Sequence, residues 1–199
     1  MPSDISLDTG TSVNDFAGLT TTGGASVGRV SVTAGTLSGT LTIDGSLTEL
    51  VTSGHLGGEV SVGGVLGTLS LGGDLSVGGR VSAGSIVTAS VGGDLAGGVA
   101  TSAGGGIGVL GVTGSLTGTV EAGVVGNRGA MSEISFGSVA GGGRVDGKAD
   151  GDGTLVVNGT DMTAWPGAVF HLIADGLFFE VQALGGITVG DTTVTLTET

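Results

Sequence analysis

The sequence predicts an all-β protein: a right-handed, three-sided parallel β-solenoid with about 20 residues per coil, followed by a small antiparallel C-terminal β module. Two observations carry the solenoid prediction. Apolar residues recur with one shared period of about 20 residues, and paired glycines separate short runs of alternating apolar and polar residues. A chain that winds at this period lays the apolar residues of each coil on those of the coil before it.

Three apolar columns share the period. The first contains Leu37, Leu56, Leu75, Leu95 and Leu116. The second contains Leu41, Val60, Val81, Val99 and Val120. The third contains Val30, Leu50, Leu69, Ala89, Leu110 and Met131. Because these columns run in step, they predict a stack of coils with one continuous apolar interior.

The N-terminal residues 1–26 are expected to form a cap. Val13, Phe16 and Leu19 are the apolar side chains available to cover the open end of the first coil. Such a cover is needed because a terminal coil otherwise exposes a row of unpaired backbone groups.

Residues 27–150 are expected to hold the coils. Glycine pairs such as Gly72-Gly73 and Gly92-Gly93 separate the short strands and predict bends, because glycine tolerates backbone conformations that other residues avoid. Right-handed winding is expected because connections between parallel strands are almost always right-handed.

The outward positions give a second test of the register. The residues that precede the first column include Asp74 and Asp94, which are expected to stack one coil apart. Like charges at that distance repel unless a cation or a basic group lies between them. Glu59 and Arg80, which precede members of the second column, are expected to stack as a favourable pair worth about 0–1 kcal/mol when exposed.

Residues 151–199 lack the repeat and contain most of the large aromatic side chains, including Trp165 and Phe170. Asp175-Gly176 lies between two apolar runs, which is a strong hairpin signal. We expect a small antiparallel β module here that caps the last coil or docks on another subunit.

Composition narrows the classes of partner. Five Lys and Arg residues face 18 Asp and Glu residues, which gives a net charge of −13. A chain of this charge repels nucleic acid and anionic lipid and attracts divalent cations. The chain contains no cysteine, so disulfides and thiolate metal sites are excluded. No apolar run is long enough to span a bilayer, so no membrane span is expected.

The N-terminus shows neither the basic region nor the apolar region of a signal peptide. The chain is therefore expected to be cytosolic at birth, already processed, exported without a cleavable signal, or a fragment of something longer.

The candidate site is a metal site. Asp146, Asp150 and Asp152 lie close together in a glycine-rich stretch, and such carboxylates can wrap Ca²⁺ through their oxygen atoms. The alternative is a solvated linker. No catalytic residue is expected, because His55 and His171 belong to different modules and the carboxylates of the coils are too sparse for a polysaccharide-cleaving cleft.

The segments 70–79 and 90–98 share the motif Gly-Gly-Asp-Leu between apolar triplets. This pattern resembles the glycine-rich repeats of very large bacterial cell-surface proteins of planctomycete type, over roughly residues 27–145. The resemblance implies a β-solenoid, an extracellular setting and a structural or adhesive role, and it supplies no catalytic residues. The C-terminal module looks somewhat like small β modules of phage tail and fibre proteins.

The expected function is that of a non-enzymatic structural protein at the cell surface or outside the cell. It would form a homo-oligomer or filament through its ends, by stacking of coils and docking of the C-terminal module. One alternative is a trimeric phage fibre or other virion component. Another is a β-helix that binds or cleaves polysaccharides.

Overall fold

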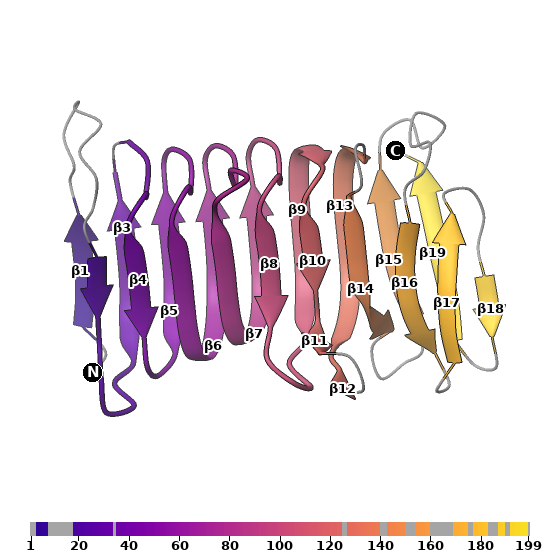
Figure 1. Cartoon of the computed structure of the whole chain (residues 1–199), viewed down its shortest axis with the longest axis horizontal. Helices are drawn as coiled ribbons and strands as arrows, with labels where there is room; N and C mark the ends of the chain where they lie inside the picture. The colour runs from indigo at the N-terminus through magenta and orange to yellow at the C-terminus, as the bar shows by residue number, and fades with distance from the viewer. Residues whose placement is uncertain are drawn as a thin grey trace.

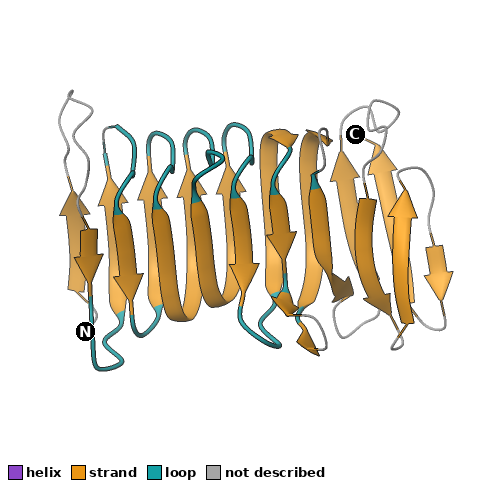
Figure 2. Ribbon diagram, viewed as in Figure 1, coloured by secondary structure: helices purple, strands orange, loops and turns teal. Residues whose placement is uncertain are grey.

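Alternation of apolar and polar residues folds this chain into strands that stack in register. The computed structural model describes residues 3–7, 18–33, 35–124, 127–139, 143–149, 154–159, 169–174, 177–182, 187–189 and 192–198. In these residues it is an all-β parallel solenoid of about six turns with no helix (Figure 2). The coils lie side by side along the long axis, from the N-terminal strands at one end to the C-terminal strands at the other (Figure 1).

Two continuous strand ladders run along the solenoid. We define the first ladder by its strands in spatial order, which are β2 (Gly18–Thr20), β4 (Thr40–Ile43), the start of β6 (Glu59–Leu71), the start of β7 (Arg80–Val91), β8 (Gly98–Thr101), β10 (Thr119–Glu121), β14 (Arg144–Ala149), β16 (Val169–Ala174) and β17 (Leu177–Gln182). Every pairing in this ladder is parallel except the last, between β16 and β17.

The second ladder uses the other segment of each coil. It contains β1 (Ser3–Leu7), β3 (Val27–Val32), β5 (Leu47–Thr52), the ends of β6 and β7, β9 (Ile107–Leu116), β13 (Ala130–Val139), β15 (Thr154–Gly159), β19 (Thr192–Glu198) and β18 (Ile187–Val189). Again only the final pairing, between β19 and β18, is antiparallel.

The first and second apolar columns are confirmed. The five leucines of the first column pair through single parallel bridges from coil to coil. The five residues of the second column are register partners in the first ladder. All ten side chains are fully buried, so together they form the interior that the period predicted.

The third column is confirmed from Val30 to Leu110, but its last member was predicted wrongly. Leu110 pairs with Ile134, and Met131 pairs with Ile107 instead. The reason is a short hairpin of β11 (Gly123–Val124) and β12 (Asn127–Arg128), which adds residues to this coil before the ladder resumes. The core therefore keeps its spacing although the sequence period lengthens.

Within the predicted N-terminal cap, residues 1–2 and 8–17 lie outside the described residues. Val13 and Phe16 fall in that stretch, whereas Leu19 lies in β2 and packs, partly buried, against the core. The strands β1 and β2 pair in parallel with β3 and β4.

Near the C-terminus, β16 and β17 pair in antiparallel register, as the expected hairpin requires. Asp175 and Gly176, where the turn was expected, lie outside the described residues. The strands β15 and β16 also pair in parallel with β13 and β14. The two ladders therefore continue past residue 150.

Candidate functional site

The three aspartates of the predicted calcium loop are only partly placed. Asp150 and Asp152 lie outside the described residues, and for Asp146 the structure describes the backbone in β14. Among the residues whose side chains are described, no three His, Asp or Glu side chains gather to hold a metal ion. Calcium binding by this loop stays a prediction.

The register around Asp146 is informative in itself. Asp146 pairs with Glu121 in β10 on one side and with His171 in β16 on the other. His171 in turn pairs with Glu180 in β17. Winding thus brings His171, which the sequence analysis separated from the coils, to the same register position as Asp146.

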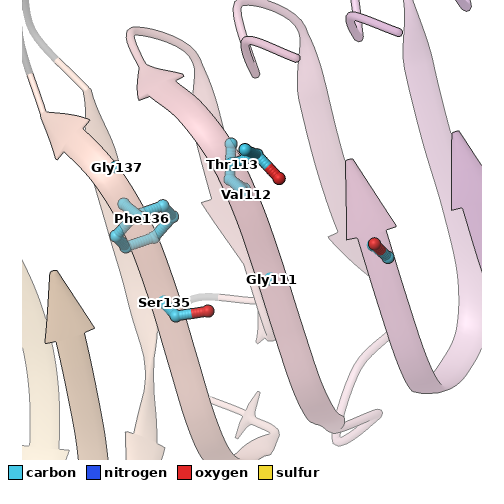
Figure 3. Close-up of a pocket in the computed structure, with 7 residues that line it drawn as sticks. Gly111, Val112, Thr113, Ser135, Phe136 and Gly137 are labelled. Carbon is cyan, nitrogen blue, oxygen red and sulfur yellow. The ribbon is translucent and has the colours of Figure 1, made fainter. Parts of the chain in front are cut away.

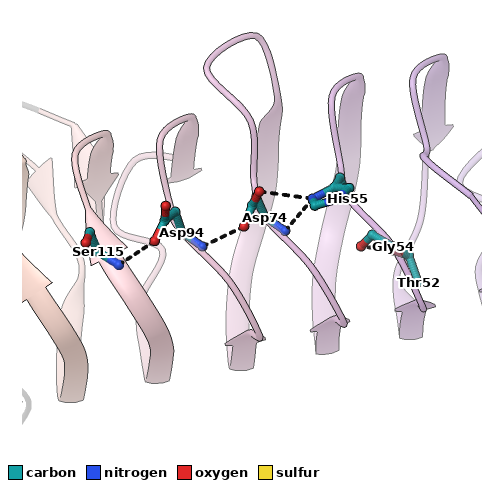
Figure 4. A network of polar contacts seen from close by, with 6 residues as sticks. All are labelled: Thr52, Gly54, His55, Asp74, Asp94 and Ser115. Atoms are coloured by element: carbon teal, nitrogen blue, oxygen red, sulfur yellow. Dashed lines mark hydrogen bonds and ion pairs between the residues drawn. The ribbon is translucent and has the colours of Figure 1, made fainter.

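A polar ladder at one bend is the best-defined arrangement of ionisable groups among the described residues. We call His55, Asp74, Asp94 and Ser115 the aspartate ladder, because each of these residues precedes a leucine of the first column (Figure 4). The backbone N–H of Asp74 donates to Nδ1 of His55 at 2.9 Å. The N–H of Asp94 donates to Oδ1 of Asp74 at 2.9 Å, and the N–H of Ser115 donates to Oδ1 of Asp94 at 2.8 Å.

This arrangement explains how two aspartates stack one coil apart. Asp74 and Asp94 stack one coil apart, as predicted, and each carboxylate receives a backbone N–H from the next coil. A hydrogen bond from a backbone N–H to a carboxylate is charge-assisted and stronger than a neutral one. An imidazole lies one coil earlier, where Nδ1 of His55 is 3.1 Å from Oδ2 of Asp74.

The glycine before each residue that donates its N–H in this ladder is required by the same contacts. A Cβ on Gly93 would meet Oδ1 of Asp74, and a Cβ on Gly114 would meet Oδ1 of Asp94. A Cβ on Gly73 would lie 2.8 Å from Nδ1 of His55. The motif Gly-Asp-Leu therefore supplies a gap, an acceptor for the next coil and a core residue, and the glycine was the signal that could have revealed the ladder.

A second polar ladder lies at another bend, where each member precedes an apolar residue of the second strand ladder. We call Ser26, Ser46 and Val65 the serine ladder. The N–H of Ser46 donates to Oγ of Ser26, and the N–H of Val65 donates to Oγ of Ser46, both at 3.0 Å. The next member of the register is Ser85, which pairs with Val65. The valine side chain offers Ser85 no acceptor, so the side-chain ladder stops there.

Winding also brings charged residues into register on the strand surfaces. Glu59 and Arg80 are register partners, as predicted. Close contacts between ionisable side chains include Arg29 with Glu49, at 3.2 Å, and His55 with Asp74. The pair of Arg29 and Glu49 follows from their register in β3 and β5.

Shallow hollows mark the outer surface where glycine interrupts a column of side chains. One hollow lies around Gly111, and Figure 3 shows the side chains of Ser135 and Phe136 beside it. Two further hollows share Arg80 and are otherwise lined by small residues, with hydroxyl groups from Ser82, Ser102 and Thr119. Such linings can exchange hydrogen bonds with a polar ligand.

The two ends of the solenoid present strand edges. Among the described residues, β1 pairs only with β3 and β2 only with β4, so each keeps one edge open at the N-terminal end. At the other end, β17 pairs only with β16 and β18 only with β19. An open strand edge carries backbone donors and acceptors that can pair with another chain.

No family model, curated protein or solved structure matches this chain. In the part of the chain that the structure describes, no helix has the length and hydropathy needed to cross a membrane.

Proposed function

We propose that this protein is a non-enzymatic structural protein that assembles end to end into an extracellular fibre or surface layer. The observation that carries the proposal is that, among the described residues, both strand ladders finish in strands with one unpaired edge, β1 and β2 at one end and β17 and β18 at the other. Strand addition at such edges uses backbone hydrogen bonds, so it needs no dedicated side chain chemistry.

Strand direction indicates how two copies would join. Because β17 and β18 run opposite to the strands before them, a second copy that is stacked head to tail meets these strands in antiparallel sense (Figure 1). Antiparallel pairing is at least as favourable per residue as the parallel pairing within the coils. The contact would therefore join β2 of one copy to β17 of the next, and β1 to β18.

We also propose that the coil is right-handed and has three sides. Three columns of glycine support three corners, because at most of their positions a Cβ would meet a backbone carbonyl of the preceding coil. The columns are Gly39, Gly58, Gly79, Gly97 and Gly118; Gly45, Gly64, Gly84, Gly105 and Gly129; and Gly35, Gly54, Gly73, Gly93 and Gly114. Right-handed winding follows the general preference of parallel connections.

A proline in the edge strand β2 tests the assembly. The N–H of Thr21 donates inward to the carbonyl of Thr42. Because donors alternate sides along a strand, the N–H of Thr20 faces the open edge. Thr20→Pro removes that donor and leaves the pairing with β4 intact, since proline is tolerated on edge strands. Sedimentation velocity at rising protein concentration should show wild-type protein and the control Thr20→Ser associating, and Thr20→Pro remaining monomeric with an unchanged midpoint of thermal unfolding.

Two other outcomes would reject the proposal. A wild-type protein that stays monomeric at every concentration has no end-to-end contact, and association of Thr20→Pro that equals wild type excludes β2 from it. A closed trimer would favour the virion-fibre alternative. Adding a calcium chelator to the same runs tests the predicted calcium loop of Asp146, Asp150 and Asp152. If calcium orders this part of the chain, its removal by the chelator should weaken association.

Arg80 favours one alternative function, the binding of an acidic polysaccharide. Arg80 lines two hollows that are also lined by hydroxyl-bearing residues, and this combination suits a uronate, which carries one carboxylate among many hydroxyls. Titration calorimetry with polygalacturonate and with neutral dextran would test it. Binding of polygalacturonate alone, lost in Arg80→Gln, would support the alternative, and no heat with either polymer would exclude it.

A further inference from the structure

The contact between His55 and Asp74 contains two interactions that need opposite protonation states of one atom. Nδ1 of His55 accepts the N–H of Asp74 at 2.9 Å, which requires a lone pair on Nδ1. The same Nδ1 lies 3.1 Å from Oδ2 of Asp74, and a favourable contact with a carboxylate requires a proton on Nδ1. Figure 4 shows both contacts converging on the imidazole.

We propose that His55 forms a pH-dependent link between two coils in the aspartate ladder. With neutral His55 carrying its proton on Nε2, Nδ1 holds the N–H of Asp74 and so links the two coils through the backbone. When the imidazole gains a proton, Nδ1–H donates to Oδ2 of Asp74, and the N–H of Asp74 loses its acceptor. Acidification thus exchanges a side-chain-to-backbone bond for an ion pair at this one position.

The surroundings confine the exchange to these two residues. The preceding coil presents Thr36 at this position, which does not titrate, and the following coil presents Asp74. Asp94 lies one coil beyond Asp74. The side chains of His55 and Asp74 are 53% and 42% exposed, so protons reach the imidazole directly from solvent.

The rest of the ladder provides an internal control. The N–H groups of Asp94 and Ser115 donate to carboxylate oxygens and not to an imidazole nitrogen. Only the N–H of Asp74 depends on a histidine. The proposed pH-dependent link therefore predicts that the protection of the Asp74 amide changes with pH and that of the Asp94 amide does not.

NMR on ¹⁵N-labelled protein between about pH 8 and pH 5, the range in which imidazoles titrate, tests the proposal directly. At the upper end, the imidazole spectrum should show the tautomer with its proton on Nε2. On acidification, the protection factor of the Asp74 amide against exchange should fall about tenfold, as for loss of an ordinary hydrogen bond, while that of Asp94 stays constant. A wild-type Asp74 amide with pH-independent protection, or a proton on Nδ1 at pH 8, would overturn it.

The variant His55→Asn distinguishes protonation of His55 from protonation of other groups. The asparagine amide oxygen can accept the N–H of Asp74, but it does not gain a proton in this range. The variant should keep the Asp74 amide protected at both ends of the range. The same step in His55→Asn as in wild type would assign the response to another group and reject the proposal.

Discussion

The aspartate ladder and the serine ladder both link successive coils at a bend, but the aspartate ladder is continuous from His55 to Ser115 and the serine ladder is interrupted. Both use a side-chain acceptor of one coil to hold a backbone N–H of the next. The aspartate ladder keeps an acceptor at each of its members, whereas the serine ladder is interrupted by Val65. The interruption changes one side chain and leaves the register intact, since Val65 still pairs with Ser85.

The comparison separates two requirements of a bend. One is an acceptor on the outward residue, and the other is a glycine before the corresponding residue of the next coil, because the acceptor occupies the place of a Cβ there. A Cβ on Gly64 would lie 2.5 Å from Oγ of Ser46, as one on Gly93 would meet Asp74. At Ser85 the glycine is present, as Gly84, and the acceptor is absent.

The largest effect is expected when a required glycine is filled. Gly93→Ala should destabilise the fold by about 2–3 kcal/mol, because the new methyl group displaces the Asp74 carboxylate and breaks its bond to Asp94. Gly78→Ala is the matched control, since its nearest neighbour would be the carbonyl oxygen of Gly57 at 3.6 Å. Chemical denaturation should find the control within about 0.5 kcal/mol of wild type. Equal losses of stability in both variants would show that the glycine before the donating residue is not specifically required.

Removal of an acceptor should cost less. Asp94→Ala takes the carboxylate from the N–H of Ser115, and we expect a loss of about 1–1.5 kcal/mol. Asp94→Asn keeps an oxygen at the same place and should recover at least half of that loss. Denaturation curves for both variants decide the matter, and an asparagine as damaging as the alanine would mean that charge rather than the hydrogen bond maintains the ladder.

Repair of the interrupted ladder is expected to stabilise the protein slightly. Val65→Ser places a hydroxyl opposite the N–H of Ser85, and Gly84 already leaves room for it. The valine is 43% exposed, so little buried apolar area is lost. We predict a gain of about 0.5 kcal/mol over the control Val65→Ala, read from the midpoint of denaturation. A serine variant less stable than the alanine variant would show that the two ladders follow different rules.

The smallest effect belongs to the surface ion pair. Arg29 and Glu49 are 50% and 37% exposed, so Glu49→Gln should change the free energy of unfolding by less than about 0.5 kcal/mol, and the difference should shrink in 0.5 M salt. A larger loss of stability that does not depend on salt would mean that this ion pair on the strand surface stabilises the fold as much as the hydrogen bonds at the bends do.

The fold was predictable to the extent that burial dictated it. The leucine column and the second column were found because their inward positions are all apolar, and these positions recur with the coil. The shift from Met131 to Ile134 was missed because the hairpin of β11 and β12 lengthens one coil, and a period counted along the sequence cannot recognise an excursion that leaves the ladder.

The polar contacts were harder to foresee. Stacking of Asp74 on Asp94 was predicted from register. Whether this stacking is favourable depends on a hydrogen bond from a backbone N–H, and the direction of a backbone N–H cannot be read from the residue types. The neighbourhood of Asp146 shows the same limit. Its register partner His171 is brought there by winding, and sequence distance alone gave no reason to join them.

Electron microscopy of the purified wild-type protein over a range of concentrations tests the central claim of end-to-end assembly most directly. We predict long, unbranched fibres one solenoid wide that lengthen as the concentration rises. Discrete particles of constant size at every concentration would contradict it, because open edges that accept another copy must then be absent or covered at one end.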